Sequence, residues 1–419
     1  MTYVSGSLDF TDGKYTIRGN SVLQVAREFT TPFYLYDVEQ VVAQYTSLKE
    51  YITWDDLKIY YAMKANFSIP ILKRLLSEGA SVDTVSPAEV HLVQSLGFPN
   101  ERILYTANNL TEDEMDEVHS LGVMFNIGSL SRLEKFAAAY PGSEVCLRFN
   151  PDVVAGEHSI VRTGGDLTKF GILLKDVEQV KDIVKRYNLK VVGLHEHTGS
   201  GIAETDKVYK SMQNLLSIAT PENFPDLQFV DFGGGFKVPY APDEKVIDYR
   251  SFGAEISRIF SEHCESTGRH LQMYFEPGKY LVAESGLLVL QVNTIKDNNG
   301  RLIAGTNSGF SHLIRPILYQ AYHHIVNLSN PDGKLQKYDV CGNICETGDC
   351  FAVDRELPEL REGDYIAILN AGAYCASMAA PYNLRPLPAE VVIEGDSVRL
   401  TKKAKTNAEL AQQILGEYR

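Results

Sequence analysis

A repeated alternation of short apolar segments and amphipathic stretches runs through the middle of the chain. The stretches after the apolar segments have apolar residues at spacings of three and four, as in SIPILKRLLSEG, and Gly79, Gly97 and Gly122 stand where helices would end. The alternation predicts a (β/α)8 barrel, a TIM-like fold, with an open doubly wound sheet as the alternative. The strand-like segments are residues 58–64, 80–86, 102–107, 123–128, 144–150, 191–199, 227–235 and 272–278.

After residue 285 the sequence changes to β-rich segments separated by turn residues. This pattern predicts a C-terminal antiparallel β domain, either a sandwich or a barrel. The N-terminal segment also alternates and has a turn at Asp12-Gly13, so we expect its strands to join that domain. Thr406 and Glu409 have capping-box spacing, which predicts a short terminal helix. The expected domains are a barrel over 33–285 and a β domain over 1–32 and 286–419.

The composition limits the class of protein. A net charge of −14 argues against nucleic-acid and anionic-membrane partners, because both attract basic surfaces. We find neither a leader pattern nor an apolar run of about 18 residues, so we expect a cytoplasmic protein. The six cysteines are too scattered for a disulfide framework, and Cys341, Cys345 and Cys350 have the wrong spacing for zinc. We therefore expect no metal.

Polar residues gather where the predicted strands end. In a (β/α)8 barrel these ends face one mouth, which is where catalytic groups lie. The sequence therefore predicts an active site there. The residues are Lys64, Asp83, Ser86, Arg148, His195, His197, Ser200, Gly233, Gly234, Gly235, Glu276 and Lys279.

The glycines and the lysine together indicate pyridoxal 5'-phosphate (PLP). Gly233, Gly234 and Gly235 follow the seventh strand, where barrels often bind phosphate, and glycine lets backbone N–H groups approach closely. PLP needs a lysine for a Schiff base with its aldehyde, and Lys64 can supply it. We expect burial and nearby cations to lower the pKa of Lys64.

Three more residues would complete such a site. Glu276 is placed to keep the ring nitrogen of PLP protonated, which makes the ring a strong electron sink. His197 can stack on the ring, and Asp83 can orient His197.

Several ordered motifs resemble the fold-type III PLP-dependent decarboxylases of basic amino acids, across nearly the whole chain. Among these enzymes, the branch that acts on meso-2,6-diaminopimelate is the most similar. The motifs are YYAMKAN (60–66), HEHTGSG (195–201), DFGGGF (231–236), EPGKYL (276–281), CETGD (345–349) and GAY (372–374), with TGGDLTKFGI (163–172), SHLIRPILYQAYHHI (311–325) and YNLRPLPAEVVI (382–393) typical of that branch.

The resemblance implies a role for each matching residue. Lys64 resembles the Schiff-base lysine, His197 the ring-stacking histidine and Glu276 the partner of the ring nitrogen. Cys345 resembles the proton donor, and Glu346 the residue that binds the distal amine of the substrate. The phosphate cradle corresponds to Ser200, Gly233, Gly234, Gly235, Gly278 and Lys279, the cofactor contacts to Asp83, Arg148 and Tyr374, and the substrate contacts to Lys279, Arg315, Tyr319 and Tyr374.

The resemblance also implies a reaction and an assembly. The reaction is decarboxylation of meso-2,6-diaminopimelate to L-lysine and CO2, the last step of lysine biosynthesis. The assembly is a homodimer with shared active sites, in which the CETGD loop and Tyr374 cross the interface. Glu276 favours decarboxylation over racemisation, since a racemase of this fold carries arginine there. Arg315 favours this substrate, because lysine and ornithine have no distal carboxylate to bind.

Two other functions stay open from the sequence. One is a related decarboxylase of D-lysine, D-ornithine or carboxynorspermidine, and the other is a non-catalytic regulatory homologue. The chain also departs from the usual family pattern twice: Lys279 replaces an arginine, which removes a bidentate fork, and Cys375 stands where a small residue is common.

Overall fold

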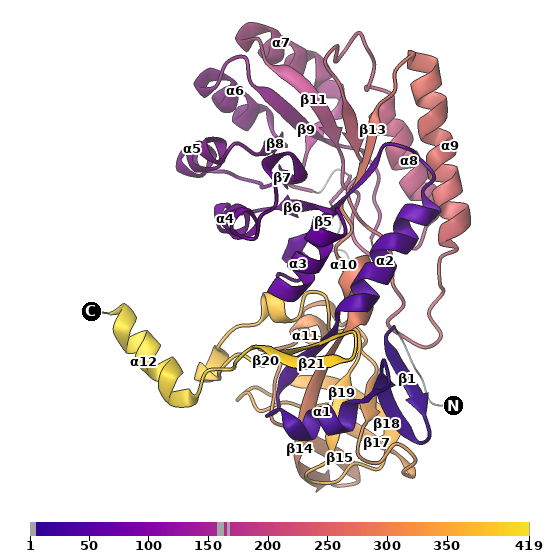
Figure 1. The fold of residues 1–419 in the computed structure, drawn as a ribbon, viewed down its shortest axis with the longest axis vertical. Coiled ribbons are helices and arrows are strands. Elements are labelled where there is room, and N and C mark those ends of the chain that lie inside the picture. Colours follow the sequence, from indigo (N-terminus) through magenta and orange to yellow (C-terminus); the bar gives the residue numbers. More distant parts are fainter. Residues whose placement is uncertain (1–5, 157–162, 166–167, 419) are drawn as a thin grey trace.

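Eight parallel strands close into a barrel in the computed structural model, which describes residues 6–156, 163–165 and 168–418 (Figure 1). The strand order is β9-β11-β12-β13-β5-β6-β7-β8, and β8 pairs with β9 to complete the ring. The predicted barrel is confirmed, and the open-sheet alternative is wrong. The strands are β5 (Leu57–Ala62), β6 (Ser81–Thr84), β7 (Ile103–Tyr105), β8 (Met124–Ile127), β9 (Glu144–Asn150), β11 (Lys190–His195), β12 (Phe229–Asp231) and β13 (Gln272–Phe275), with the short β10 (Ile172–Leu173) added to β9.

Helices between these strands cover the outside of the barrel (Figure 1). Gly122 ends its helix in the left-handed conformation, and Gly79 and Gly97 have positive φ just beyond two other helices, so the predicted helix ends are confirmed. The helices are α2 (Val38–Tyr51), α3 (Ile69–Ser77), α4 (Pro87–Ser95), α5 (Glu112–Leu121), α6 (Leu130–Ala139), α7 (Val177–Tyr187), α8 (Thr205–Leu216) and α9 (Tyr249–Thr267). No helix in the described part of the chain is long and apolar enough to cross a membrane.

The second domain is built on a sheet in the order β18-β17-β15-β14-β4-β20-β21, with β16 and β19 attached through β14. The pairs β15–β17 and β4–β20 are parallel and the other strand pairs are antiparallel, so the predicted antiparallel β domain is confirmed as a mixed, mainly antiparallel sheet. The strands are β4 (Phe33–Asp37), β14 (Gly286–Asn298), β15 (Arg301–Thr306), β16 (Ile325–Asn327), β17 (Leu335–Cys341), β18 (Cys350–Pro358), β19 (Tyr365–Ile368), β20 (Ala389–Glu394) and β21 (Ser397–Lys402).

The N-terminal strands form a small antiparallel sheet of their own, made of β1 (Leu8–Thr11), β2 (Lys14–Ile17) and β3 (Asn20–Ser21), before helix α1 (Val22–Glu28). Asp12 and Gly13 both have positive φ, which confirms the predicted turn. Leu8 and Ile17 pack in one apolar core with side chains of β4 and β14. The segment therefore joins the β domain by packing and not by strand pairing. Residues 2–5 of the predicted alternation lie outside the described residues.

Two details at the ends of the β domain complete the fold. Helix α12 (Asn407–Glu417) begins at Thr406 with the predicted capping box to Glu409, and it extends away from the domain (Figure 1). At the other end, β4 pairs with β14 and β20. Residues 33–37 therefore belong to the β-domain sheet, and the predicted boundary at 33 is wrong: the barrel begins with α2 at residue 38.

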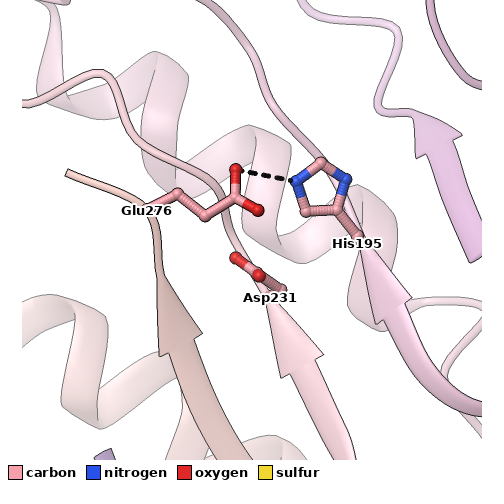
Figure 2. A group of neighbouring side chains, drawn as sticks. All are labelled: His195, Asp231 and Glu276. Atoms are coloured by element: carbon pink, nitrogen blue, oxygen red, sulfur yellow. Dashed lines mark hydrogen bonds and ion pairs between the residues drawn. The ribbon is translucent and has the colours of Figure 1, made fainter. Parts of the chain in front are cut away.

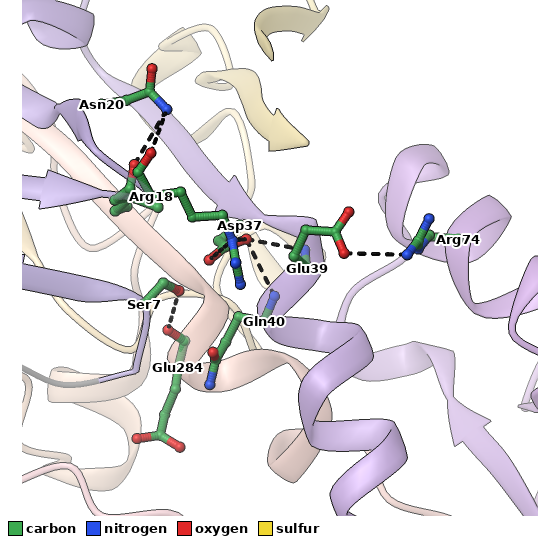
Figure 3. A network of polar contacts seen from close by, with 9 residues as sticks. Ser7, Arg18, Asn20, Asp37, Glu39, Gln40, Arg74 and Glu284 are labelled. Carbon is green, nitrogen blue, oxygen red and sulfur yellow. Dashed lines mark hydrogen bonds and ion pairs between the residues drawn. The ribbon is translucent and has the colours of Figure 1, made fainter. Parts of the chain in front are cut away.

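A polar network holds the point where the chain passes from β4 into the barrel (Figure 3). The Asp37 carboxylate is buried and accepts hydrogen bonds from the backbone N–H groups of Glu39 and Gln40, which caps α2. The same carboxylate pairs with Arg18 Nε at 2.8 Å, and Glu39 pairs with Arg74 of α3 at 3.2 Å. One side chain thus links the N-terminal segment, the β domain and the first barrel helix.

Replacing Asp37 with alanine removes both the cap and the ion pair. We expect the free energy of unfolding to fall by about 1–3 kcal/mol, seen as a lower thermal midpoint by calorimetry. Asp37→Asn is the matched control, because it keeps a capping oxygen but has no charge for Arg18. An alanine variant with the wild-type midpoint would contradict this role.

Candidate active site

Two connected cavities lie between the barrel mouth and the β domain. The larger has a volume of about 480 Å³ and is lined by barrel residues and by Arg315, Tyr319 and Tyr374 from the chain after the barrel. The smaller is lined by Lys64, Gly235, Glu276 and Gly278, among others. The two share His197, Ser200, Lys279 and Tyr374. The structure therefore brings most of the predicted site residues to one place.

Lys64 follows β5 in a single 3-10 turn, Met63–Ala65, and its Nζ atom lies 2.8 Å from Asp83 Oδ2. Its side chain is 36% exposed, toward the cavity. Burial lowers the pKa of Lys64, but the carboxylates of Asp83 and Glu276 raise it more, so the pKa lies above its usual value. The expected depressed pKa is wrong for the chain by itself, because carboxylates and not cations dominate around the ammonium group.

His197 is oriented by the glycine loop. Its Nδ1 atom accepts a hydrogen bond of 3.0 Å from the backbone N–H of Gly234, whereas Asp83 bonds to Lys64. The expectation that Asp83 orients His197 is therefore wrong. Burial, with the charges of Arg148 and Lys64, lowers the pKa of His197 far below its usual value. The ring is therefore neutral, and His197 lines both cavities, where it can stack on a bound ring.

The glycine loop approaches the neighbouring backbone too closely for side chains. A Cβ atom on Gly234 would lie 2.5 Å from the carbonyl oxygen of Glu276. Gly233 has φ +64°, and a Cβ atom there would lie 2.6 Å from the carbonyl oxygen of Glu196. Only glycine fits this bend, which brings Gly235 to the smaller cavity, while the N–H groups of Gly233 and Gly234 donate to Asp231 and His197.

Glu276 belongs to a buried cluster that the sequence analysis did not assign (Figure 2). Its Oε2 atom lies 3.2 Å from His195 Nε2, and its Oε1 atom accepts from Thr106 at 3.5 Å. The polar atoms of His195, Asp231 and Glu276 all lie within 4.8 Å of one another. The signal was present in the sequence, since His195 ends the sixth strand and Asp231 directly precedes the three glycines.

Arg315 begins the short helix α11 (Arg315–Tyr319), and its guanidinium group is buried in the larger cavity. Its Nε atom donates to His323 Nε2 at 3.2 Å, and its charge lies over the rings of Tyr240 at 4.8 Å and Tyr319 at 5.8 Å. His323 Nδ1 in turn bonds to a backbone carbonyl, so the ring is fixed in orientation. The sequence analysis assigned no role to Tyr240, which stands in no recognisable motif, or to His323, which lies within the quoted segment 311–325.

Tyr374 adopts an uncommon backbone conformation, with φ +55°, and its N–H group donates to the carbonyl of Ala65 at 2.8 Å. This bond ties the GAY segment to the turn that carries Lys64. Tyr374 lines both cavities of its own chain, which fits a binding role, so the expectation that Tyr374 crosses a dimer interface is wrong.

Cys345 and Glu346 lie apart from this site. Neither lines the two cavities of their own chain as far as the structure describes it, and both are exposed on the loop between β17 and β18. The N–H group of Cys345 donates to Asn383 Oδ1 at 3.1 Å, and Glu346 accepts from the hydroxyl of Tyr382. The structure therefore does not bring the expected proton donor to the lysine of the same chain.

The residues present fit PLP. Gly235 of the glycine loop, Ser200 and Lys64 all line the smaller cavity, so the phosphate and the aldehyde of PLP can both be received there. Arg148 is buried beside Phe170, at 4.6 Å from the ring, and its Nη2 atom has no hydrogen-bond partner among the described residues. A buried donor without a partner is costly, so a polar group of a ligand is expected there.

The comparisons with known proteins agree with this site. A model of the pyridoxal-binding domain of pyridoxal-dependent decarboxylases matches residues 38–283. The chain belongs to this family, whose cofactor is PLP. The diaminopimelate decarboxylase of Methanothermobacter thermautotrophicus is 37% identical over 95% of both chains.

Solved structures agree as well. The diaminopimelate decarboxylase of Helicobacter pylori, complexed with L-lysine, has a TM-score of 0.87 at 30% identity and covers 95% of this chain and 100% of its own. That of M. jannaschii, also with L-lysine, has a TM-score of 0.89 at 27% identity over 98% of both chains. Within the pyridoxal-dependent decarboxylases, the chain is thus a member of the diaminopimelate decarboxylase group.

The buried Glu196, next to His197 in the sequence, allows a test of its pKa shift through the pH dependence of stability. Its buried carboxylate accepts hydrogen bonds from Thr198 and Ser211, and burial still raises its pKa to about 7. A raised pKa means that the folded state binds the proton more tightly, so stability falls as pH rises from the unfolded value near 4.5 to about 7. We expect the free energy of unfolding of Glu196→Gln to be close to that of wild type at pH 5. At pH 8 we expect it to be larger by roughly 3 kcal/mol.

Thermal midpoints of the two proteins between pH 5 and pH 8 measure this difference. Because the other buried acids are unchanged, subtraction isolates Glu196. A difference that does not change with pH would contradict the raised pKa.

Proposed function

We propose that this chain decarboxylates meso-2,6-diaminopimelate to L-lysine and CO2, and so completes lysine biosynthesis. The observation that carries the proposal is the buried guanidinium of Arg315 in the cavity that joins the one lined by Lys64. The guanidinium group lines this cavity, where it can form a charge-assisted, bidentate pair with the distal carboxylate of this substrate. The curated relatives reported above carry the same activity in their names.

The residues divide into those that would hold the cofactor and those that would act on the substrate. When bound, PLP supplies an electron-withdrawing ring that stabilises the negative charge left by the loss of CO2. Lys64 would hold its aldehyde carbon, Glu276 its ring nitrogen and His197 one ring face. Its phosphate would lie on Ser200, Gly233, Gly234, Gly235 and Gly278, with Asp83, Arg148, Lys279 and Tyr374 as further contacts.

The remaining residues would bind substrate and move one proton. Arg315, with Tyr319 and Lys279, would orient the distal carboxylate, and Glu346 would pair with the distal ammonium group. Cys345 would donate the proton from its Sγ atom to the carbon that lost CO2. A positioned thiol can act as the general acid in such a step.

This assignment needs a second copy of the chain. Cys345 and Glu346 are exposed on their own chain, away from its cavities. A symmetric homodimer would place the loop of one protomer over the cavity of its partner, and the two sites would be equivalent. We also propose a cytoplasmic location, where the six cysteines, all free in the structure, would stay reduced.

Replacing Arg315 with alanine tests the substrate. We expect KM for meso-diaminopimelate to rise at least about tenfold, since a charge-assisted pair is lost, while the bound-cofactor absorbance stays unchanged. Steady-state kinetics and a visible spectrum measure both. D-lysine, which lacks the distal carboxylate, is the control substrate and should show little change. An unchanged KM for meso-diaminopimelate would contradict the assignment.

Complementation tests the shared site. Lys64→Ala and Cys345→Ala should each be inactive, yet co-expression should restore up to about a quarter of wild-type activity. The reason is that one site of each mixed dimer would combine the intact lysine of one chain with the intact cysteine of the other. Activity of the co-expressed pair no greater than that of either variant alone would rule out sharing.

A further inference from the structure

The cluster of His195, Asp231 and Glu276 arises from three neighbouring strands. His195 and Asp231 are direct partners in the parallel register of β11 and β12, so their side chains leave the same face of the sheet. Glu276 follows β13, the next strand of the barrel. All three side chains are buried, and Figure 2 shows the Asp231 carboxyl pointing toward that of Glu276.

Two carboxyl groups this close in a dry interior cannot both be ionised without a large cost. Burial raises the pKa of Glu276 as well, but the charges of Lys64 and Arg148 stabilise its ionised form, so Glu276 is the better candidate to carry the negative charge. Asp231 instead has Glu276 and Asp83 as neighbours, and burial together with these carboxylates raises its pKa well above the usual value. The proton of the pair therefore belongs on Asp231.

The hydrogen bonds of Asp231 agree with this assignment. Its Oδ1 atom accepts a hydrogen bond of 2.8 Å from the backbone N–H of Gly233, which is what the carbonyl oxygen of a neutral acid can do. Its Oδ2 atom is buried and has no partner within hydrogen-bond distance among the described residues. A proton on Oδ2 can be directed at the Glu276 carboxylate, which lies within the 4.8 Å cluster.

His195 has one available role in the same cluster. Burial and the charge of Arg148 lower its pKa well below the usual value, so the ring is neutral. Its Nε2 atom faces a carboxylate and must carry the ring hydrogen, whereas Nδ1 has no partner among the described residues and keeps its lone pair. The contact with Glu276 thus fixes the tautomer.

The other groups around Asp231 do not compete for its proton. Below it, the interior of the barrel holds Tyr60, Cys146 and Tyr274, and burial raises the pKa of each, so all three are neutral. Above it are Glu276, Asp83, His195 and Arg148. Among these groups, Glu276 offers Oδ2 a carboxylate oxygen within the same cluster.

We propose that Asp231, as a protonated carboxylic acid, and neutral His195 are positioning residues that hold Glu276 ionised and oriented toward the ring nitrogen of PLP. The inference deepens the proposed function, because it rests on the assignment of Glu276 to that nitrogen. Thr106 and His195 contact the Glu276 carboxylate as donors, and the proton on Asp231 would add a third. Asp231 also connects this cluster to the phosphate loop through Gly233.

The test compares substitutions that keep or remove the donor. Asp231→Asn keeps an oxygen for Gly233 and an N–H for Glu276, as a protonated acid does, and Asp231→Ala keeps neither. His195→Gln retains a donor that His195→Phe lacks. We expect the Asn and Gln variants to stay within about threefold of wild type in PLP affinity and in the pH profile of the bound-cofactor absorbance. The Ala and Phe variants should bind PLP about tenfold or more weakly, with a displaced profile.

A direct measurement on folded protein complements the variants. Infrared difference spectroscopy of the cofactor-loaded wild type at pH 7 should show the C=O stretch of a buried protonated carboxylic acid, lost in Asp231→Asn. Absence of that band, or an Asn variant as impaired as the Ala variant, would overturn the proposal, because Asp231 would then act as an anion. A stoichiometric zinc ion that His195→Phe releases would overturn it as well, since the three residues would then be metal ligands.

The readouts also separate this inference from the proposed function. A chain that binds PLP and shows the infrared band, yet does not decarboxylate meso-diaminopimelate, would refute the function and leave the proton assignment standing. A chain that decarboxylates meso-diaminopimelate but lacks the infrared band would support the proposed function and refute the proton assignment.

Discussion

The pairing of β8 with β9 closes the barrel, and everything at the active site depends on that closure. Parallel strands in a closed ring deliver all their carboxyl ends to one mouth. Lys64, Asp83, Arg148 and His195 come from strands separated by up to about 130 residues of chain, yet their polar groups interact at one mouth of the barrel. The β domain covers that mouth with Arg315 and Tyr374, so neither domain has a complete site alone.

The charge balance at the mouth favours carboxylates. Asp83 and Glu276 face Lys64, with Asp231 close behind, whereas the buried histidines are neutral. Burial raises the pKa of Asp83 to about 6 even with the Lys64 ammonium beside it. Such an arrangement suits a ligand that brings a protonated ring nitrogen.

Much of this was predictable from the sequence, for physical reasons. A period of 3.6 against a period of 2 separates helices from strands, so the alternation fixed the order of the barrel elements. The chemistry at the strand ends then indicated a lysine-bound cofactor. The sequence analysis assigned residues 33–37 to the barrel, because a buried apolar strand has the same pattern in either sheet. Only its pairing with β14 and β20 shows that it belongs to the β domain. Side-chain partners such as Asp83 with Lys64, or Asp231 with Glu276, depend on distances that no spacing in the sequence reports.

The most direct test of the account is the reaction itself. Purified protein with PLP should release CO2 from meso-2,6-diaminopimelate and form L-lysine in equal amounts, identified by chiral chromatography and mass spectrometry. Release of CO2 from D-lysine, D-ornithine or carboxynorspermidine in preference to meso-diaminopimelate, or no release from any of them, would contradict the account.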